Sequence, residues 1–280
     1  MKKLILTVLF AVLINVSAVF AQSASSLNSQ SLNGATGLYS IPTGHVGWEN
    51  RGNFGIDFGY RAIINNDSGV AHIPAVTLTF AKMIEISTAF DIQPNNYYSN
   101  SEQNNDDLLF GFKIKLPTSK STAIAIGTSV QLININNDNN DYNAYQPYVA
   151  ITYAGNFFSM PANTTVLFGK TLYTGGPENN SNVDFGMGFD LILFPDVFKD
   201  AVHWIIDFSN FSYSDNSWPN NSYYHTNSMW RGILNTGFRI NMSAIPALSK
   251  FKFVIDVVFN DLFDAGARSF TIGAVFGFSP

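Results

Sequence analysis

The alternation of apolar and polar residues along the chain is the feature that most restricts its fold. Residues 54–61 read FGIDFGYR, with an apolar or aromatic side chain at every even position and Gly, Asp or Arg at every odd one. In a strand, successive side chains point to opposite faces, so this segment has one apolar and one polar face. The same pattern recurs in 108–116, 183–193, 251–259 and 270–278. The alternation therefore predicts an all-β chain whose strands have two unlike faces.

The residues on the polar face distinguish two all-β architectures. A soluble antiparallel sandwich exposes that face to water, where long polar side chains are favoured. Here the face is mostly Gly, Ala, Ser, Asp and Lys, which suits the crowded lumen of a membrane barrel whose apolar face contacts lipid. Only 12% of residues are charged, against about 25% in soluble proteins. We predict an antiparallel up-and-down transmembrane β-barrel, with a soluble sandwich as the alternative.

The number of strands and their connections support the barrel. A pass along the chain predicts about twelve strands, an even number, as in bacterial outer-membrane barrels. Long Asn-rich connections fall at one end and shorter ones, such as 155–163, at the other, which indicates an extracellular and a periplasmic side. The expected strands are 53–64, 70–80, 83–92, 107–116, 122–133, 144–154, 164–173, 183–193, 201–211, 229–242, 251–260 and 269–278.

The first residues have the pattern of a secretory signal. A basic start, an apolar core and a small-residue site ending at Ala21 predict a signal peptide over 1–21. Residues 22–52 are expected to form a lead-in, either periplasmic or tucked into the lumen, and residues 53–280 the barrel. The predicted location is the bacterial outer membrane. No Cys occurs, which excludes disulfides and thiolate metal sites.

Charged and polar residues of the inward face are the candidate site, as a lining of the lumen. Acids and bases nearly balance, so most are expected to pair because unpaired charges in a partly dry interior are costly. The remainder would line a water path without strong selectivity for either charge. The predicted lumen-lining residues are Asp57, Arg61, Glu85, Asp91, Lys113, Lys115, Asp184, Asp190, His203, Asp207, Arg231, Arg239, Lys252 and Asp256.

Aromatic residues cluster near the expected strand ends, as in the girdles of membrane barrels. At the outer level these are Tyr97, Tyr98, Tyr145, Tyr148, Trp218 and Trp230. At the inner level they are Trp48, Phe157, Phe158, Phe194 and Trp204.

Catalytic and cofactor chemistry find little support. The four His residues, His45, His72, His203 and His225, cannot be matched to a nucleophile and an orienting group, so we expect no enzyme activity. No metal-ligand spacing occurs, and we expect no metal or other cofactor. The net charge of −5 argues against nucleic-acid binding.

Two short segments resemble parts of known outer-membrane proteins. Residues 33–43, NGATGLYSIPT, resemble the N-terminal Gly-x-x-Gly-Leu-x-x-x-Pro-Thr segment of YjbH-like proteins, which are associated with exopolysaccharide, and of uncharacterised barrels, including spirochaete ones. The matching positions are Gly34, Gly37, Leu38, Pro42 and Thr43. The final alternating strand, with Phe276 and Phe278, resembles the signal read by the barrel assembly machinery. Both resemblances imply location and fold more than activity.

Two functions are therefore considered. The first is a channel or porin-like protein for small hydrophilic solutes. The second is a structural or surface-interaction protein, serving adhesion or envelope integrity, that uses its Asn- and Tyr-rich extracellular loops. The expected partners are outer-membrane lipids, the barrel assembly machinery and small solutes.

Overall fold

The structure is a computed structural model. It describes residues 29–65, 69–93, 106–118, 121–135, 142–157, 159–175, 181–214, 232–244, 251–263 and 268–279. Within these ranges the chain is almost entirely β-strand, with one four-residue helix, α2 (Pro195–Phe198), and one 3-10 turn, η1 (Met242–Ala244). No helix in the described ranges has the length and apolar character needed to cross a membrane. The signal peptide predicted over 1–21 lies outside these ranges.

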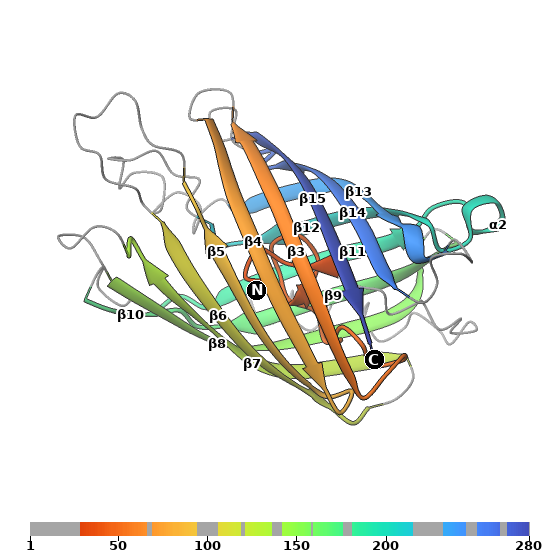
Figure 1. Ribbon diagram of the computed structural model, residues 1–280, viewed down its shortest axis with the longest axis horizontal. Helices are drawn as coiled ribbons and strands as arrows, with labels where there is room; N and C mark the ends of the chain where they lie inside the picture. Colours follow the sequence, from red (N-terminus) through yellow and green to blue (C-terminus); the bar gives the residue numbers. More distant parts are fainter. Residues whose placement is uncertain are drawn as a thin grey trace, which may run out of the picture.

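Twelve antiparallel strands form a closed barrel (Figure 1). Each strand pairs with the next along the chain, and the β15–β3 pairing joins the last strand to the first. A short strand, β10 (Leu172–Thr174), extends β9 and pairs with the outer part of β8. The barrel strands are β3 (Phe54–Asn65), β4 (Gly69–Phe80), β5 (Ile84–Asp91), β6 (Asp107–Leu116), β7 (Thr122–Ile133), β8 (Tyr142–Phe157), β9 (Met160–Gly169), β11 (Asp184–Ile192), β12 (Val202–Ser209), β13 (Ile233–Asn241), β14 (Lys252–Asn260) and β15 (Ser269–Phe278).

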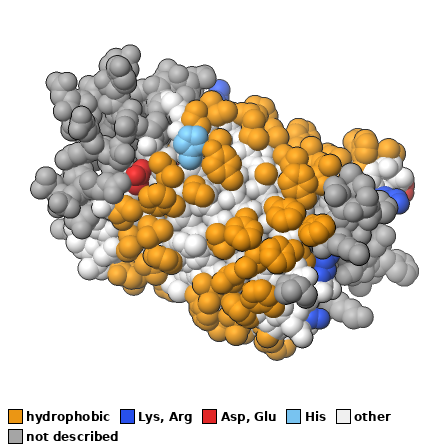
Figure 2. Space-filling view, viewed as in Figure 1, with side chains coloured by type: hydrophobic (Ala, Val, Ile, Leu, Met, Phe, Trp, Pro, Cys, Tyr) orange, Lys and Arg blue, Asp and Glu red, His pale blue; other side chains and the backbone are white. Residues whose placement is uncertain are grey.

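The alternation in the sequence becomes the two faces of the wall. Along β15, Thr271, Val275 and the other odd-numbered positions are buried, while Phe276 and Phe278 are exposed. Figure 2 shows hydrophobic side chains spread over the face formed by the strands, with charged side chains near its edges. An exposed apolar wall is costly in water and favourable in lipid. The predicted all-β transmembrane barrel is thus confirmed, and the soluble sandwich is not the fold.

The two ends of the barrel differ in their connections. At the end where β3 begins, consecutive strands are separated in the sequence by 81–83, 117–121, 158–159, 193–201 and 242–251. At the other end, the longest separation in the sequence is 210–232. One connection is shorter than expected. We predicted a loop over 155–163, but β8 continues to Phe157 and β9 starts at Met160. Pairing of these two strands, from Phe157 with Met160 onward, extends them through residues that favour turns in isolation.

The N-terminal segment, residues 29–49, lies inside the barrel and is called the plug here. It contains two two-residue strands, β1 (Ser29–Gln30) and β2 (Thr36–Gly37), which pair with each other. Every residue of the plug is buried except His45, which is partly exposed. In Figure 1 this segment, in red, is enclosed by the barrel strands. The lead-in therefore occupies the lumen over the whole of its length from 29 to 49.

Candidate functional site in the barrel interior

Buried ion pairs line the half of the lumen nearer the short turns. Glu85 and Lys113 face each other on β5 and β6, with 2.9 Å between Oε1 and Nζ. Asp57 on β3 lies 2.8 Å from the Nζ of Lys252 on β14. All four side chains are almost completely buried. Because a buried charge without a partner is costly, pairing is what permits them inside the wall.

A third cluster centres on Arg239 of β13. Its guanidinium binds Asp256 through Nε at 2.8 Å and approaches Asp190 at 3.5 Å. Arg61 of β3 approaches the same Asp256 at 3.7 Å. Asp190 also lies 2.5 Å from Nδ1 of His203, whose Nε2 faces Asp200 at 3.3 Å. The cluster thus links strands of the wall through alternating acids and bases and holds the wall together on this side.

The same charged groups bind the main chain of the plug. Glu85 accepts hydrogen bonds from Thr36 N at 2.8 Å, from Thr36 Oγ1 at 2.5 Å and from Gly47 N at 3.1 Å. Its ion-pair partner Lys113 donates to Thr36 O at 2.9 Å. One ion pair therefore satisfies both the amide and the carbonyl of a single plug residue. Hydrogen bonds with a charged partner are about twice as strong as neutral ones.

Three further contacts hold the rest of the plug. Asp207 of β12 accepts from Ser40 N at 2.7 Å and from Ser40 Oγ at 2.9 Å. Asp57 accepts from Trp48 Nε1 at 2.9 Å, and Lys252 lies 5.5 Å from the Trp48 ring centre. Arg61 donates to the carbonyls of Gln30 and Ser31. Together with those of Glu85 and Lys113, these contacts come from β3, β5, β6, β12 and β14, so the barrel binds the plug from several sides.

Inward glycines of the wall receive the larger side chains of the plug. A Cβ at Gly55 would overlap the Trp48 ring, and one at Gly186 would lie 2.7 Å from Ile41 Cγ2. Gly188 is similarly close to Leu38. The glycines that alternate with Phe and Met on these strands thus leave the space that the plug occupies. Inward Gly was the sequence signal that the interior is filled by another segment.

Glu49, the last residue of the plug, pairs with His45 and Lys115 near the end of the barrel where β3 begins, and we call these two contacts the latch. Glu49 Oε1 lies 2.7 Å from His45 Nδ1, and Glu49 Oε2 lies 2.7 Å from Lys115 Nζ at the end of β6. Burial by itself would raise the pKa of Glu49. The hydrogen bonds and charges of His45 and Lys115 outweigh it and lower that pKa from 4.5 to about 2. Glu49 therefore stays ionised at neutral pH and ties the plug to the rim.

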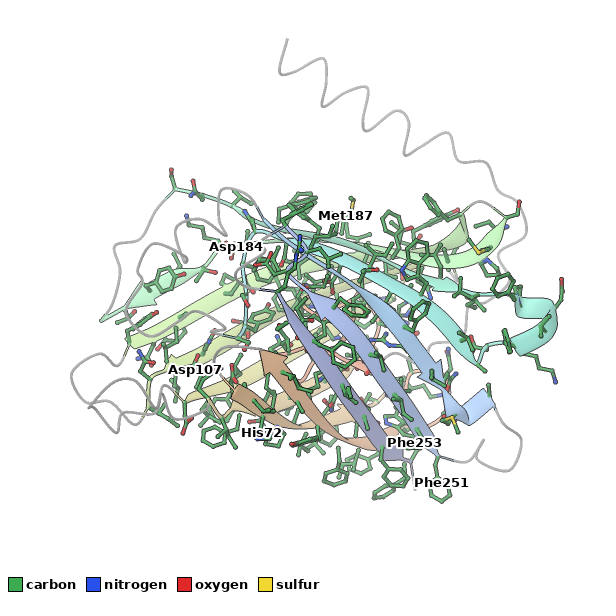
Figure 3. All side chains as sticks on the ribbon, turned by 90° about the horizontal axis from the view of Figure 1, so that it is seen from above. His72, Asp107, Asp184, Met187, Phe251 and Phe253 are labelled. Atoms are coloured by element: carbon green, nitrogen blue, oxygen red, sulfur yellow. The ribbon has the colours of Figure 1, made fainter. Side chains whose placement is uncertain are left out.

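At the opposite end, inward carboxylates accept hydrogen bonds from amides and hydroxyls. Asp184 on β11 accepts from Gln146 Nε2 at 2.7 Å and from Thr171 Oγ1 at 2.6 Å. Asp107 on β6 accepts from Gln131 Nε2 at 2.7 Å. Figure 3 shows Asp107 and Asp184 toward the end with the longer connections, opposite Phe251 and Phe253. Tyr213, beyond β12, folds back over this end and donates to Gln146.

The structure locates thirteen of the fourteen predicted lumen residues. Twelve are buried toward the interior, and Lys115 is partly exposed at the rim, where its side chain is 23% accessible. Arg231 lies outside the described residues. Most of the buried ones, together with Lys115 and the Glu49 that the prediction omitted, form the ion pairs above. The sequence did not predict that these charged wall residues also bind the plug. In a segment without strand periodicity, the direction in which each side chain points cannot be predicted.

Two aromatic residues that we assigned to the girdles lie inside the barrel instead. Trp48 was expected at the inner girdle but is buried against Asp57. Tyr148 was expected at the outer girdle but points inward from β8, where it pairs with Gly127 and Gly169 and uses the space they leave. Tyr145, Phe157, Phe194 and Trp204 are exposed. Tyr97, Tyr98, Phe158, Trp218 and Trp230 lie outside the described residues.

Comparison with known proteins establishes the fold. No protein-family model and no curated protein matches the sequence. Among solved structures, the NanC porin shares 10% identity with a TM-score of 0.50, covering 81% of this chain and 100% of that one. The KdgM porin shares 9% identity, with a TM-score of 0.47 and coverages of 81% and 99%. LpxR from Salmonella typhimurium, an outer-membrane enzyme, shares 8% identity, with a TM-score of 0.47 and coverages of 80% and 99%.

The fold and the wall together assign the chain to its compartment. A closed antiparallel barrel with an apolar exterior satisfies every strand hydrogen bond within the wall, as the hydrocarbon core of a membrane demands. Barrels of this kind belong to the bacterial outer membrane, which is the location of this protein. At about a tenth identity, the solved structures establish the fold alone, and function has to be argued from the interior.

Proposed function

We propose that the protein is an outer-membrane, porin-like channel for small hydrophilic solutes, closed in this conformation by its own plug. One observation carries the proposal. The material that fills the lumen comes from a separate N-terminal segment, while the wall behind it is polar and charged. Without the plug, the twelve-stranded wall would surround a hydrophilic lumen, which is the arrangement of porins.

The residues of the wall support a weakly selective path. Asp57, Glu85 and Asp256 are matched by Lys252, Lys113 and Arg239 at 2.8 to 2.9 Å. Such pairs leave little net charge along the half of the lumen nearer the short turns, so this half would strongly exclude neither anions nor cations. We therefore propose small polar solutes of either charge as the cargo, with the predicted lumen residues as the lining.

Conductance in planar lipid bilayers tests this function. We would compare the mature chain with a variant lacking residues 29–49, each purified in detergent and checked by circular dichroism for its strand content. The expected result is a closed or briefly opening full chain and a large, steady conductance for the variant. Silence from a variant that has assembled as a barrel would contradict the channel.

The close packing of the plug favours a second candidate. Since plug residues 29–44 are all buried in the described structure, the barrel could act as a closed structural or surface-interaction protein. Its extracellular loops lie largely outside the described residues. Silent bilayers with both chains, together with loss of surface binding when those loops are deleted, would support this alternative.

We also infer kinship with the YjbH-like and related barrels at the level of the plug. All five residues of the shared pattern, Gly34, Gly37, Leu38, Pro42 and Thr43, belong to the plug, and Gly37 forms a β-bridge with Pro42. In the same way, the outward Phe276 and Phe278 of the last strand support recognition by the barrel assembly machinery. Refolding of the plugless chain with and without that machinery would test the second point.

A further inference from the structure

We infer that the interior of this barrel is a peptide-binding site, and that its ligand is the glycine-rich segment 29–49, held as an exchangeable ligand and not as a fixed part of the wall. The consequence for transport rests on the proposed channel function, whereas the binding can be measured by itself. Four features of the interior support the inference.

The first feature is that the wall binds the peptide main chain. The pair Glu85–Lys113 holds the amide and the carbonyl of Thr36, with N–H to carboxylate and ammonium to C=O distances of 2.8 and 2.9 Å. Asp207 holds the amide of Ser40, and Thr152 Oγ1 accepts from Gly44 N at 2.9 Å. Buried donors and acceptors that are paired with a peptide backbone in this way form a specific peptide-binding site.

The second feature is shape. Gly55, Gly186 and Gly188 form recesses that admit Trp48, Ile41 and Leu38. The plug is glycine-rich where it approaches the wall closely, since a Cβ at Gly47 would lie 2.7 Å from Asp57 Oδ2. Complementary recesses on one partner and missing side chains on the other restrict the ligand to a narrow class of sequences.

The third feature is that the plug carries its own fold. Ser31 N donates to Ala35 O at 2.7 Å, Leu32 N to Tyr39 O at 2.9 Å and Thr43 N to Thr36 O at 3.1 Å. No hydrogen-bonded strand pair joins the plug to the wall among the described residues. A preorganised peptide loses less conformational freedom on binding, and releasing it breaks no strand pairing of the barrel.

The fourth feature is that three ion pairs of the wall do not depend on the ligand. Asp57 keeps Lys252, Glu85 keeps Lys113 and Asp256 keeps Arg239, because all six residues belong to barrel strands. Vacating the lumen therefore leaves no isolated buried charge among these residues. For these six residues, the cost of an unpaired buried charge does not oppose release of the ligand.

Binding in trans tests the inference. A fluorescently labelled synthetic peptide of residues 29–49 is titrated into the variant lacking those residues, and its anisotropy is followed. We expect saturable binding, none by a scrambled peptide, and at least about tenfold weaker binding to Glu85→Gln/Lys113→Met. Lys199→Gln, on the exposed turn after α2, is the matched control and should bind as the parent does. Absence of binding to an assembled barrel overturns the inference.

The same preparation separates this inference from the proposed function. Peptide binding without any conductance would support the site and reject the channel. A barrel that conducts, but that neither binds the peptide nor is blocked by it, would support the channel and reject the site. If the peptide is added from the side where β3 begins, and it both binds and stops the current, both proposals are supported.

A second variant decides the matter if the shortened chain does not assemble. Ser40 Oγ and Ser209 Oγ are 3.5 Å apart, and the chain has no cysteine, so Ser40→Cys/Ser209→Cys offers a single disulfide between plug and wall. After reduction, we expect the thiol introduced into the plug to react with a water-soluble maleimide as the plug leaves and returns. A reduced plug thiol that stays unreactive over hours, while a Lys199→Cys control reacts at once, would show a permanent plug and overturn the inference.

Discussion

At the scale of single residues, the absence of a side chain at Gly186 has a structural purpose. The three atoms nearest to a Cβ placed there all belong to Ile41 in the plug. Overpacking of such a contact costs about 1–3 kcal/mol, and here it would destabilise the bound state of the plug. Period-two alternation identified Gly186 as inward, but it could not say which side chain would use the space.

We therefore predict that Gly186→Ala loosens the plug. In a Ser40→Cys background, labelling by a water-soluble maleimide should become faster by about fivefold or more, as a loss of about 1 kcal/mol or more requires. Gly155→Ala is the control, because the atoms nearest to a Cβ at Gly155 belong to Tyr153, which is exposed on the outer face. Equal labelling rates in the two variants would contradict the role of Gly186 as a recess for the plug.

The latch at Glu49 gives a second prediction at this scale. Its pKa is lowered from 4.5 to about 2 in the folded protein, so the stabilisation is complete above pH 4.5 and is lost as the pH falls through 2. The shift corresponds to about 3 kcal/mol. The free-energy gap between the parent chain and Glu49→Gln in urea unfolding should be present at pH 5 and should close toward pH 2. A gap that persists at pH 2 would show that the latch is not electrostatic.

At the scale of elements, most strands could be predicted because lipid on one face and the lumen on the other require apolar and polar residues to alternate with a period of two. Strands β6, β7 and β15 begin and end at the expected residues. The boundary between β8 and β9 was wrong, because the pairing of Phe157 with Met160 keeps Gly155, Asn156 and Pro161 in strands. Local composition marks a turn there, and only the neighbouring strand shows how tight it is.

The outward face of a strand gives a prediction for this scale. Phe58 lies in the middle of β3 and is 48% exposed, and its exposed surface is the part that meets lipid. Phe58→Arg should lower the free energy of unfolding in lipid vesicles by about 2–4 kcal/mol, the cost of a charge at the bilayer midplane. Val197→Arg, on α2 beyond the wall, should cost almost nothing. Equal costs at both positions would mean that the Phe-rich face does not contact the hydrocarbon core.

At the scale of the whole molecule, the closed barrel and its filled lumen have different origins. Closure follows from the pairing of β15 with β3, and each wall strand needs only a partner and an apolar outer face. The plug depends on contacts between residues far apart in sequence, such as Ser40 with Asp207 and Tyr39 with Thr271. Only the assembled wall brings these partners together.

The fold class, the approximate strands, the inward and outward faces and the expectation that most interior charges pair could all be predicted from the sequence. Each of these follows from a local period of two and from the cost of leaving a charge unpaired in a dry interior. Only the folded chain shows that residues 29–49 lie in the lumen, that Trp48 and Tyr148 point inward, and that Glu85 and Lys113 bind a main chain as well as each other. A segment without regular secondary structure has no period, so its position depends entirely on the recesses and charges that the closed wall offers it.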